Sequence, residues 1–282
     1  MENNLDVMSW IGKSKEKDDY ISDFPVKAMA SVFNYNEKKI KIIPSGWHWL
    51  YFLNLPLQEN LGSDGHEKRT GFMPPIRLPI RMYAGGEIFF HKPLIIGQKL
   101  IKKSSIISID NKTGATGNLT FLKINHKILN EKEILINEYQ NLVYREDKKT
   151  QKKKKIIGLK APDKFDYEKK WNTSSEMLFR YSALTHNTHK IHYDYPYATE
   201  TEGYPNIVVH GPLMATFLLD LIDNILRDNG KKLIKFTFRL KSPVFVGGTI
   251  SAQAVHTSKG LDLWIKDQNG YQSLTALAEI SH

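Results

Sequence analysis

Cysteine is absent from all 282 residues of the sequence, so disulfide bonds, thiolate nucleophiles and cysteine-ligated metal sites are excluded. Long apolar runs are absent as well: no segment has the uninterrupted apolar length that crosses a bilayer. The first residues, MENNLDVMSWIGKSKEKDDY, have no apolar core of signal-peptide length. These absences predict a cytoplasmic protein, or one of an organelle matrix, without a membrane partner.

Arginine is scarce. Only 7 of the 40 basic residues are arginine, and the lysines behind the net charge of +10 are spread along the chain. A phosphate-binding tract for nucleic acid usually gathers arginine with stacking aromatic side chains. The sequence therefore predicts no nucleic-acid partner, although a basic surface attracts polyanionic small ligands.

One dense lysine run, KKTQKKKK, is followed by glycine and proline within residues 146–165. A segment of this kind cannot bury apolar surface, and it is more often a solvated linker than a nuclear-localisation signal. We place the domain boundary here. The prediction is an N-terminal domain at residues 1–147, a lysine-rich linker at 148–162 and a C-terminal domain at 163–282.

A shared pattern in the two predicted domains indicates an internal duplication. FFHKPLIIGQKLI at residues 89–101 matches FRLKSPVFVGGTI at residues 238–250. Two pairs of matching residues are each 150 positions apart: Pro93 and Pro243, and Gly97 and Gly247. Alternating strand patterns with turn signals follow both segments, which predicts antiparallel strands in each half.

Each half also has a candidate central helix. GPLMATFLLDLIDNILRDNG, at residues 211–230, has proline in its first turn and glycine at its end, and its apolar residues are numerous enough to be enclosed. PSGWHWLYFLNL, at residues 44–55, is the expected counterpart. These patterns predict an α+β fold, a tandem hot-dog, in which each half wraps a long antiparallel sheet around a central helix.

Four of the ten histidines lie within residues 181–213: His186, His189, His192 and His210. A metal site, an acid–base site and coincidence are the three interpretations. The first three histidines recur every third residue, but on a helix the third would rotate away from the other two. Neither cysteine nor a nearby glutamate completes a ligand set, so we expect no metal.

The stretch 179–213 resembles the MaoC-like family of R-specific enoyl-CoA hydratases and acyl-thioester dehydratases. SALTHNTHKIHYD and VVHGPL resemble the double hot-dog branch of that family most closely, as do WHWLYF and LPIRMYAGGEIFFHKPL in the N-terminal half. That branch contains mesaconyl-C4-CoA (itaconyl-CoA, 3-methylfumaryl-CoA) hydratases and mitochondrial-type 3-hydroxyacyl-thioester dehydratases. The resemblance covers most of the chain.

The resemblance implies that His192 is the catalytic histidine. Asn187, five residues earlier, stands where the wider family has aspartate. An amide orients water but cannot take its proton, so proton transfer would fall on His192. Gly211, at the start of the central helix, would use its backbone N–H to polarise the thioester carbonyl.

Further residues are candidates for substrate binding. His210 is expected to be a buried neighbour that holds the loop, and Asp194 either orients the imidazole of His192 or points away. A mesaconyl or itaconyl thioester carries a free carboxylate, which needs a cationic partner. The candidate cations are Lys190, Arg81, Arg180 and Arg239, the last two in apparent strand patterns.

Three functions remain open. The resemblance favours a mesaconyl-C4-CoA or itaconyl-CoA type hydratase, a hydro-lyase that takes an acyl-CoA substrate and needs no cofactor. A fatty-acid 3-hydroxyacyl-thioester dehydratase would instead have an apolar tunnel, and a non-catalytic acyl-CoA-binding module would have little use for His192. The N-terminal domain resembles FAS1-like dehydratase domains and is expected to be non-catalytic pocket wall, with His48 a weak site candidate. A homodimer is possible.

Overall fold

The computed structural model describes residues 6–36, 40–69, 71–114, 117–146, 158–227 and 230–281. Most of the predicted linker at 148–162 lies outside the described residues, so the domain boundaries stay a prediction. The described chain resumes at Gly158, and Lys160 then pairs with Tyr271 in an isolated bridge.

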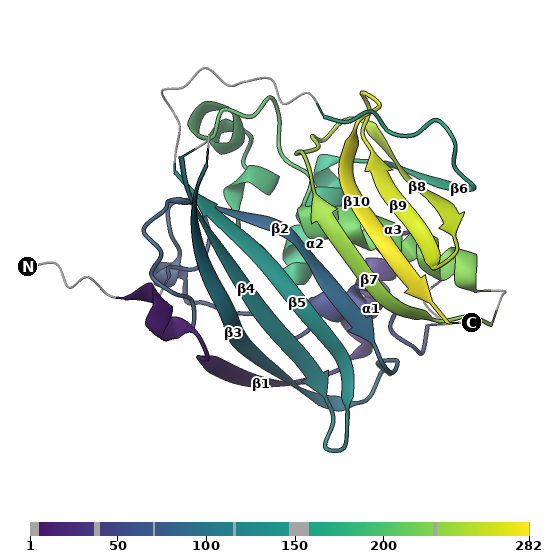
Figure 1. Cartoon of the computed structure of the whole chain (residues 1–282), viewed down its shortest axis with the longest axis horizontal. Coiled ribbons are helices and arrows are strands. Elements are labelled where there is room, and N and C mark those ends of the chain that lie inside the picture. The colour runs from purple at the N-terminus through teal and green to yellow at the C-terminus, as the bar shows by residue number, and fades with distance from the viewer. Residues whose placement is uncertain are drawn as a thin grey trace, which may run out of the picture.

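Ten antiparallel strands form one continuous sheet, in the order β1-β3-β4-β5-β2-β7-β10-β9-β8-β6 (Figure 1). The first five strands in this order come from the N-terminal half and the other five from the C-terminal half. The helices α1, α2 and α3 lie on one side of the curved sheet (Figure 1). This arrangement is the α+β tandem hot-dog that the sequence predicts.

The N-terminal half consists of a short strand, a helix, a 3₁₀ turn and four long strands. These elements are β1 (Ser14–Tyr20), α1 (Asp23–Val32), the 3₁₀ turn Trp47–Leu50, β2 (Ile80–Phe90), β3 (Lys99–Gly114), β4 (Gly117–Leu129) and β5 (Ile134–Arg145). Two further 3₁₀ turns lie at Val7–Trp10 and Gln58–Asn60.

The C-terminal half repeats this order, with a long helix where the N-terminal half has its central 3₁₀ turn. Its elements are β6 (Tyr167–Asn172), α2 (Ser175–Thr185), α3 (Gly211–Leu226), β7 (Leu233–Leu240), β8 (Thr249–Thr257), β9 (Gly260–Lys266) and β10 (Gln272–Ile280). The matching glycines, Gly97 and Gly247, both have left-handed backbones, with φ of 100° and 95°. The repeated order and the repeated turn support the duplication.

The predicted helix at 211–230 is present as α3 and forms the centre of the core. Leu213, Phe217 and Ile222 are fully buried there. Removing an apolar side chain of this size from water contributes about 1.5–3 kcal/mol. Burial on nearly every face explains why this helix has an apolar pattern all round. No helix in the described ranges is both long and apolar enough to cross a membrane.

The helix predicted at 44–55 is wrong. The segment forms only the 3₁₀ turn Trp47–Leu50, because left-handed residues stand on both sides of it: Gly46 with φ of 83° and Phe52 with φ of 56°. Ser45 instead binds α3, donating its backbone N–H and its hydroxyl to the carboxylate of Asp223 at 2.9 and 2.7 Å. The helix α3 therefore contacts the N-terminal half, which also has a second apolar core of its own around Ile109 and Leu122.

The two halves meet where β2 pairs with β7, which makes the sheet continuous. Glycine allows this approach. A Cβ at Gly85 would lie 2.2 Å from the carbonyl oxygen of Phe238, and one at Gly86 would lie 3.2 Å from Cε1 of the same residue. The edge-to-edge pairing of two hot-dog sheets thus takes place within a single chain.

Candidate active site

A cavity of about 960 Å³ is lined by both halves of the chain. The segment 185–192 and the start of α3 line it from the C-terminal half, and residues of β2, β3, β4 and β5 line it from the N-terminal half. Space is available because the N-terminal half has a 3₁₀ turn in place of a long central helix. The cavity brings both halves to one site.

His192 ends the 3₁₀ turn Lys190–His192 and is only 7% exposed. Its Nδ1 lies 2.7 Å from the carbonyl oxygen of Val208. Because a carbonyl can only accept, Nδ1 carries the proton and Nε2 is the basic nitrogen. Burial lowers the pKa of His192 to about 4, against the opposing effect of the carbonyl hydrogen bond. His192 therefore lines the cavity as a neutral base near pH 7.

His210 supports His192 from behind. The two imidazole rings are stacked, with centroids 3.8 Å apart, and His210 is fully buried. Its Nε2 lies 2.8 Å from the hydroxyl of Ser182 on α2. His210 does not line the cavity, so its contact is with the histidine and not with a ligand.

Asn187 lines the cavity just after α2. Its side-chain oxygen accepts a hydrogen bond from the backbone N–H of His189 at 3.1 Å. The oxygen is therefore used within the turn, and the amide NH₂ is the group left to meet a ligand. His186 ends α2 in a left-handed conformation and is exposed.

Gly211 is the first residue of α3 and lines the cavity. No carbonyl within the helix can accept its N–H, because the first turn of any helix leaves its donors unpaired. Its Cα is closely packed: a Cβ at this position would lie 2.7 Å from Cδ1 of Leu240. A helix start with a free N–H thus lies in the same cavity as the basic nitrogen of His192.

Four of the five predicted substrate-binding residues do not line the cavity: His210, Asp194, Lys190 and Arg239. Asp194 accepts from the backbone N–H of Tyr197 at 3.0 Å, so the imidazole of His192 is oriented by a carbonyl and not by this carboxylate. The ammonium of Lys190 lies 5.3 Å above the ring of Tyr197. Arg239 is exposed on β7.

Arg81 is the fifth of these residues, and it does line the cavity, from β2. The strand pattern predicted around Arg180 is wrong, because this residue lies on the exposed side of α2. The helix has a clear start signal, since the hydroxyl of Ser174 accepts from the backbone N–H of Met177 at 3.2 Å. Of the four expected cations, Arg81 is therefore the one placed to meet a ligand.

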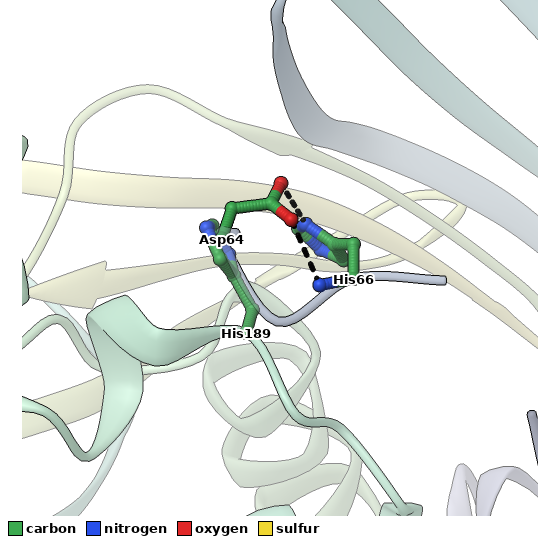
Figure 2. Close-up of side chains that lie close together, drawn as sticks. All are labelled: Asp64, His66 and His189. Atoms are coloured by element: carbon green, nitrogen blue, oxygen red, sulfur yellow. Dashed lines mark hydrogen bonds and ion pairs between the residues drawn. The ribbon is translucent and has the colours of Figure 1, made fainter. Parts of the chain in front are cut away.

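Asp64 and His66 reach the cavity from the N-terminal half, and sequence reasoning missed both. They lie in the loop between the 3₁₀ turn Gln58–Asn60 and β2. The Nδ1 of His66 lies 2.9 Å from Oδ2 of Asp64 (Figure 2). The only signal in the sequence is the turn-forming Asp-Gly pair in SDGHE, which says nothing about its partner.

His189 packs against His66, with ring centroids 4.0 Å apart, and meets His192 edge to face at 5.5 Å. Asp64, His66 and His189 each offer a metal-ligating atom within 4.8 Å of the others (Figure 2). Nδ1 of His66 and Oδ2 of Asp64 are already joined to each other by a hydrogen bond.

The wall contributed by the N-terminal half combines apolar side chains, such as Phe52, Met73 and Leu142, with polar and charged ones. The polar and charged side chains on β3, β4 and β5 are Lys102, Ser104, His126, Glu138 and Gln140. Burial raises the pKa of Glu138, but the hydrogen bond with His48 and the neighbouring cations outweigh it and lower that pKa to about 2. His48 is therefore a buried partner of Glu138, at 3.1 Å, and does not line the cavity.

Comparisons with known proteins identify similar sequences and folds. Residues 46–246 match the family model described as hydroxyacyl-thioester dehydratase type 2. The chain is 35% identical to a mesaconyl-C(4)-CoA hydratase from Chloroflexus aurantiacus, over 98% of this chain and 99% of that protein. It is 27% identical to a mitochondrial hydroxyacyl-thioester dehydratase type 2 from Schizosaccharomyces pombe, over 88% and 91%. A MaoC-like dehydratase structure from Phytophthora capsici matches with a TM-score of 0.73 at 14% identity, over 96% of each chain.

Proposed function

Because this chain belongs to the hydroxyacyl-thioester dehydratase type 2 family, we propose that it adds water to the double bond of an α,β-unsaturated acyl-CoA thioester, and removes it in reverse. The chain is a hydro-lyase of the hydratase and dehydratase class. The observation that carries the proposal is the shared cavity of a neutral imidazole, an amide and a free helix-start N–H: His192, Asn187 and Gly211.

In the hydration direction, Nε2 of His192 accepts a proton from the attacking water as the water oxygen bonds to the β-carbon. The electrons of the double bond move toward the thioester oxygen, where the N–H of Gly211 and the positive end of α3 stabilise the negative charge. The imidazolium of His192 then returns the proton to the α-carbon. Asn187 binds the water through its amide and takes no proton.

The substrate we propose is a short acyl thioester with a free carboxylate, of the mesaconyl-C4-CoA type. We assign the binding of that carboxylate to Arg81, because it lines the cavity from β2 and its charge acts on the pKa of both His66 and His189. Lys102 lies on the same wall, and a long alkyl chain packed against its ammonium would leave that group without a polar partner. The basic net charge favours the phosphates of coenzyme A.

The chemistry requires no cofactor beyond the coenzyme A of the substrate, because the proton acceptor and the charge-stabilising donor both come from the chain. The binding partner that we propose is the acyl-CoA substrate itself.

The experiment is a hydration assay with mesaconyl-C4-CoA, crotonyl-CoA and a long-chain 2-enoyl-CoA. We expect mesaconyl-C4-CoA to have the highest kcat/KM, and His192→Ala to lower kcat by roughly a hundredfold to ten-thousandfold. His256→Ala, on the exposed end of β8, is the control and should be unchanged. Preference for the long-chain substrate would instead identify a fatty-acyl dehydratase. Absence of turnover would leave a binding module, and full activity of His192→Ala would show that His192 is not the base.

A further inference from the structure

The loop at residues 61–67 holds one carboxylate–imidazole pair in a fixed geometry. An isolated bridge between Leu61 and Glu67 closes the loop, and the N–H of Gly62 donates to the carbonyl of His66 at 2.7 Å. Asp64 accepts twice from His66: from its backbone N–H at Oδ1 and from its Nδ1 at Oδ2, both at 2.9 Å (Figure 2). The backbone thus sets the position of the pair.

The same loop is docked on the segment that carries Asn187 and His192. The hydroxyl of Thr188 donates to the carbonyl of Gly65 at 2.5 Å, and the backbone N–H of Lys190 donates to the carbonyl of Asp64 at 2.9 Å. Gly65 has φ of 87°, and a Cβ there would lie only 1.9 Å from the carbonyl oxygen of Thr188. Only glycine permits this contact, which ties the pair from one half to the catalytic segment of the other.

The protonation state of the pair follows from its contacts. Burial raises the pKa of Asp64, but the hydrogen bonds from His66 outweigh it, so the net pKa is well below the usual range and Asp64 is a carboxylate. Since that carboxylate accepts from Nδ1 of His66, Nε2 is the nitrogen with a free lone pair. Burial lowers the pKa of His66 and the hydrogen bond to Asp64 raises it in part. His66 therefore lines the cavity as a neutral imidazole with a carboxylate behind it.

Five titratable or charged groups surround His66: Asp64, His189, His192, Arg69 and Arg81. Among them, Asp64 is the only anion, and His66 is the only imidazole in the cavity with a carboxylate partner at hydrogen-bond distance. His192 has a carbonyl in that position. A carboxylate behind an imidazole strengthens its free nitrogen as a hydrogen-bond acceptor. Asn187 cannot provide such an acceptor, because its amide has no negative charge.

We propose that His66 is a catalytic residue of the hydration site and that Asp64 is its positioning residue, so that the two halves of the chain hold the attacking water together. This inference rests on the proposed function. The water donates one O–H to Nε2 of His192 and the other to Nε2 of His66, which directs an oxygen lone pair at the β-carbon.

Each hydration transfers one proton of the water. As the C–O bond forms, the O–H bond that faces His192 breaks, and its proton passes to His192 and then to the α-carbon. The other O–H bond stays intact as the product hydroxyl, hydrogen-bonded to His66. His66 therefore holds the nucleophile in hydration and the leaving hydroxyl in the reverse direction, and it is unchanged at the end of the cycle.

The experiment compares His66→Gln, His66→Ala and Asp64→Asn with the wild-type chain, using the thioester that the wild type hydrates fastest. We expect His66→Gln to lower kcat by roughly tenfold to a hundredfold, with KM changed less than threefold. Asp64→Asn should lower kcat by roughly tenfold. It should also move the acid limb of the pH profile of kcat/KM to lower pH, because the carboxylate that raises the pKa of His66 is gone. Added imidazole should restore activity to His66→Ala, since it fills the space left by the ring.

Two exposed residues of the N-terminal half provide matched controls, His91→Gln and Asp110→Asn, which should keep wild-type kcat. An unchanged thermal midpoint for His66→Gln and Asp64→Asn excludes unfolding as the cause. If the wild type is active and His192→Ala is not, but His66→Gln and Asp64→Asn keep kcat within twofold and the acid limb does not move, the proposal for His66 is wrong and the proposed function stands. If the wild type hydrates no thioester, the proposed function and the proposal for His66 are both wrong.

Discussion

The two halves of the chain share an element order but differ in what fills the concave side of the sheet. The C-terminal half is filled by α3, whose Leu213 and Phe217 are fully buried. The N-terminal half has the 3₁₀ turn Trp47–Leu50 in the corresponding place, and its wall lines the cavity. One copy of the duplicated unit thus holds the long central helix, and the other combines a smaller apolar core with much of the cavity wall.

The two halves also contribute different chemical groups to the candidate site. The C-terminal half contributes a histidine and a helix start, His192 and Gly211, both held by backbone contacts next to the core. The N-terminal half contributes a carboxylate, an imidazole and a guanidinium: Asp64, His66 and Arg81. These polar groups line a cavity, where a ligand or water can pair with them, and the apolar cores of both halves stabilise the chain.

The largest expected effect is on the free energy of unfolding, which we expect to fall more for a variant in the C-terminal half than for one in the N-terminal half. Phe217→Ala in α3 should lower the free energy of unfolding by about 3–5 kcal/mol, because it leaves a cavity in a fully packed core. Gln140→Ala, on the cavity wall of β5, should cost about 1–3 kcal/mol, because it removes the hydrogen-bond partner of Nε2 of His126, and Gln140 buries less apolar surface than Phe217. Denaturant titrations of both variants check this. Equal losses would show that the N-terminal half is as tightly packed as the C-terminal half.

A pH dependence of stability tests one histidine in each half. Burial lowers the pKa of His126 in β4 and of His192 to about 4. Each folded-state pKa lies below the unfolded value near 6.5, so each residue contributes stability that is complete above that value and is lost as the pH falls toward 4. Each contributes at most about 3 kcal/mol. His126→Gln and His192→Gln should each flatten the fall in unfolding free energy between pH 6.5 and 4; a slope unchanged by either would contradict the burial of that ring.

Substrate selectivity tests the proposed role of Arg81 in the N-terminal half. Arg81→Met should lower kcat/KM for mesaconyl-C4-CoA by roughly tenfold to thirtyfold, the effect of losing one charge-assisted hydrogen bond. Crotonyl-CoA has no free carboxylate, so its kcat/KM should change less than threefold. Arg239→Met, on the exposed face of the neighbouring strand β7, is the matched control and should leave both values unchanged. Equal losses for both substrates would assign Arg81 to coenzyme A binding.

The smallest expected effect is that of removing metal ions on kcat/KM. Exhaustive dialysis against a chelator should leave kcat/KM within about 20% of its starting value, because the proton acceptor and the charge-stabilising donor we propose both belong to the chain. Mass-spectrometric metal analysis of the dialysed protein is the control for complete removal. Loss of activity that is restored by a divalent cation would assign the cluster of Asp64, His66 and His189 to metal binding.

Much of the fold was accessible from local patterns. Pro212 and Gly230 bracket an apolar run that becomes α3, and the alternating segments after Gly97 and Gly247 become strands. The helix expected at 44–55 failed because Gly46 and Phe52 adopt left-handed backbones there. An apolar run of that length is compatible with either outcome, and the contact of Ser45 with Asp223 decides between them.

The candidate site was accessible only in part. His192, Asn187 and Gly211 lie within one short stretch, so a motif could connect them. Asp64 and His66 lie far from it in the sequence and meet it through the contacts of Gly65 with Thr188. Arg239 and Lys190 carried the right charge, but side-chain direction on a strand or a turn placed them outside the cavity.

By itself, the sequence determined the repeated strands, the enclosed helix and the residues that lie next to one another at the catalytic stretch. These features depend on local backbone preferences and on the spacing of apolar side chains. Only the tertiary structure decided which half lines the cavity, which cation faces it and which loop brings Asp64 and His66 to the segment of Asn187 and His192. The contact of that loop joins Gly65 to Thr188, residues more than a hundred positions apart, and the two halves meet where β2 pairs with β7 and Ser45 binds α3.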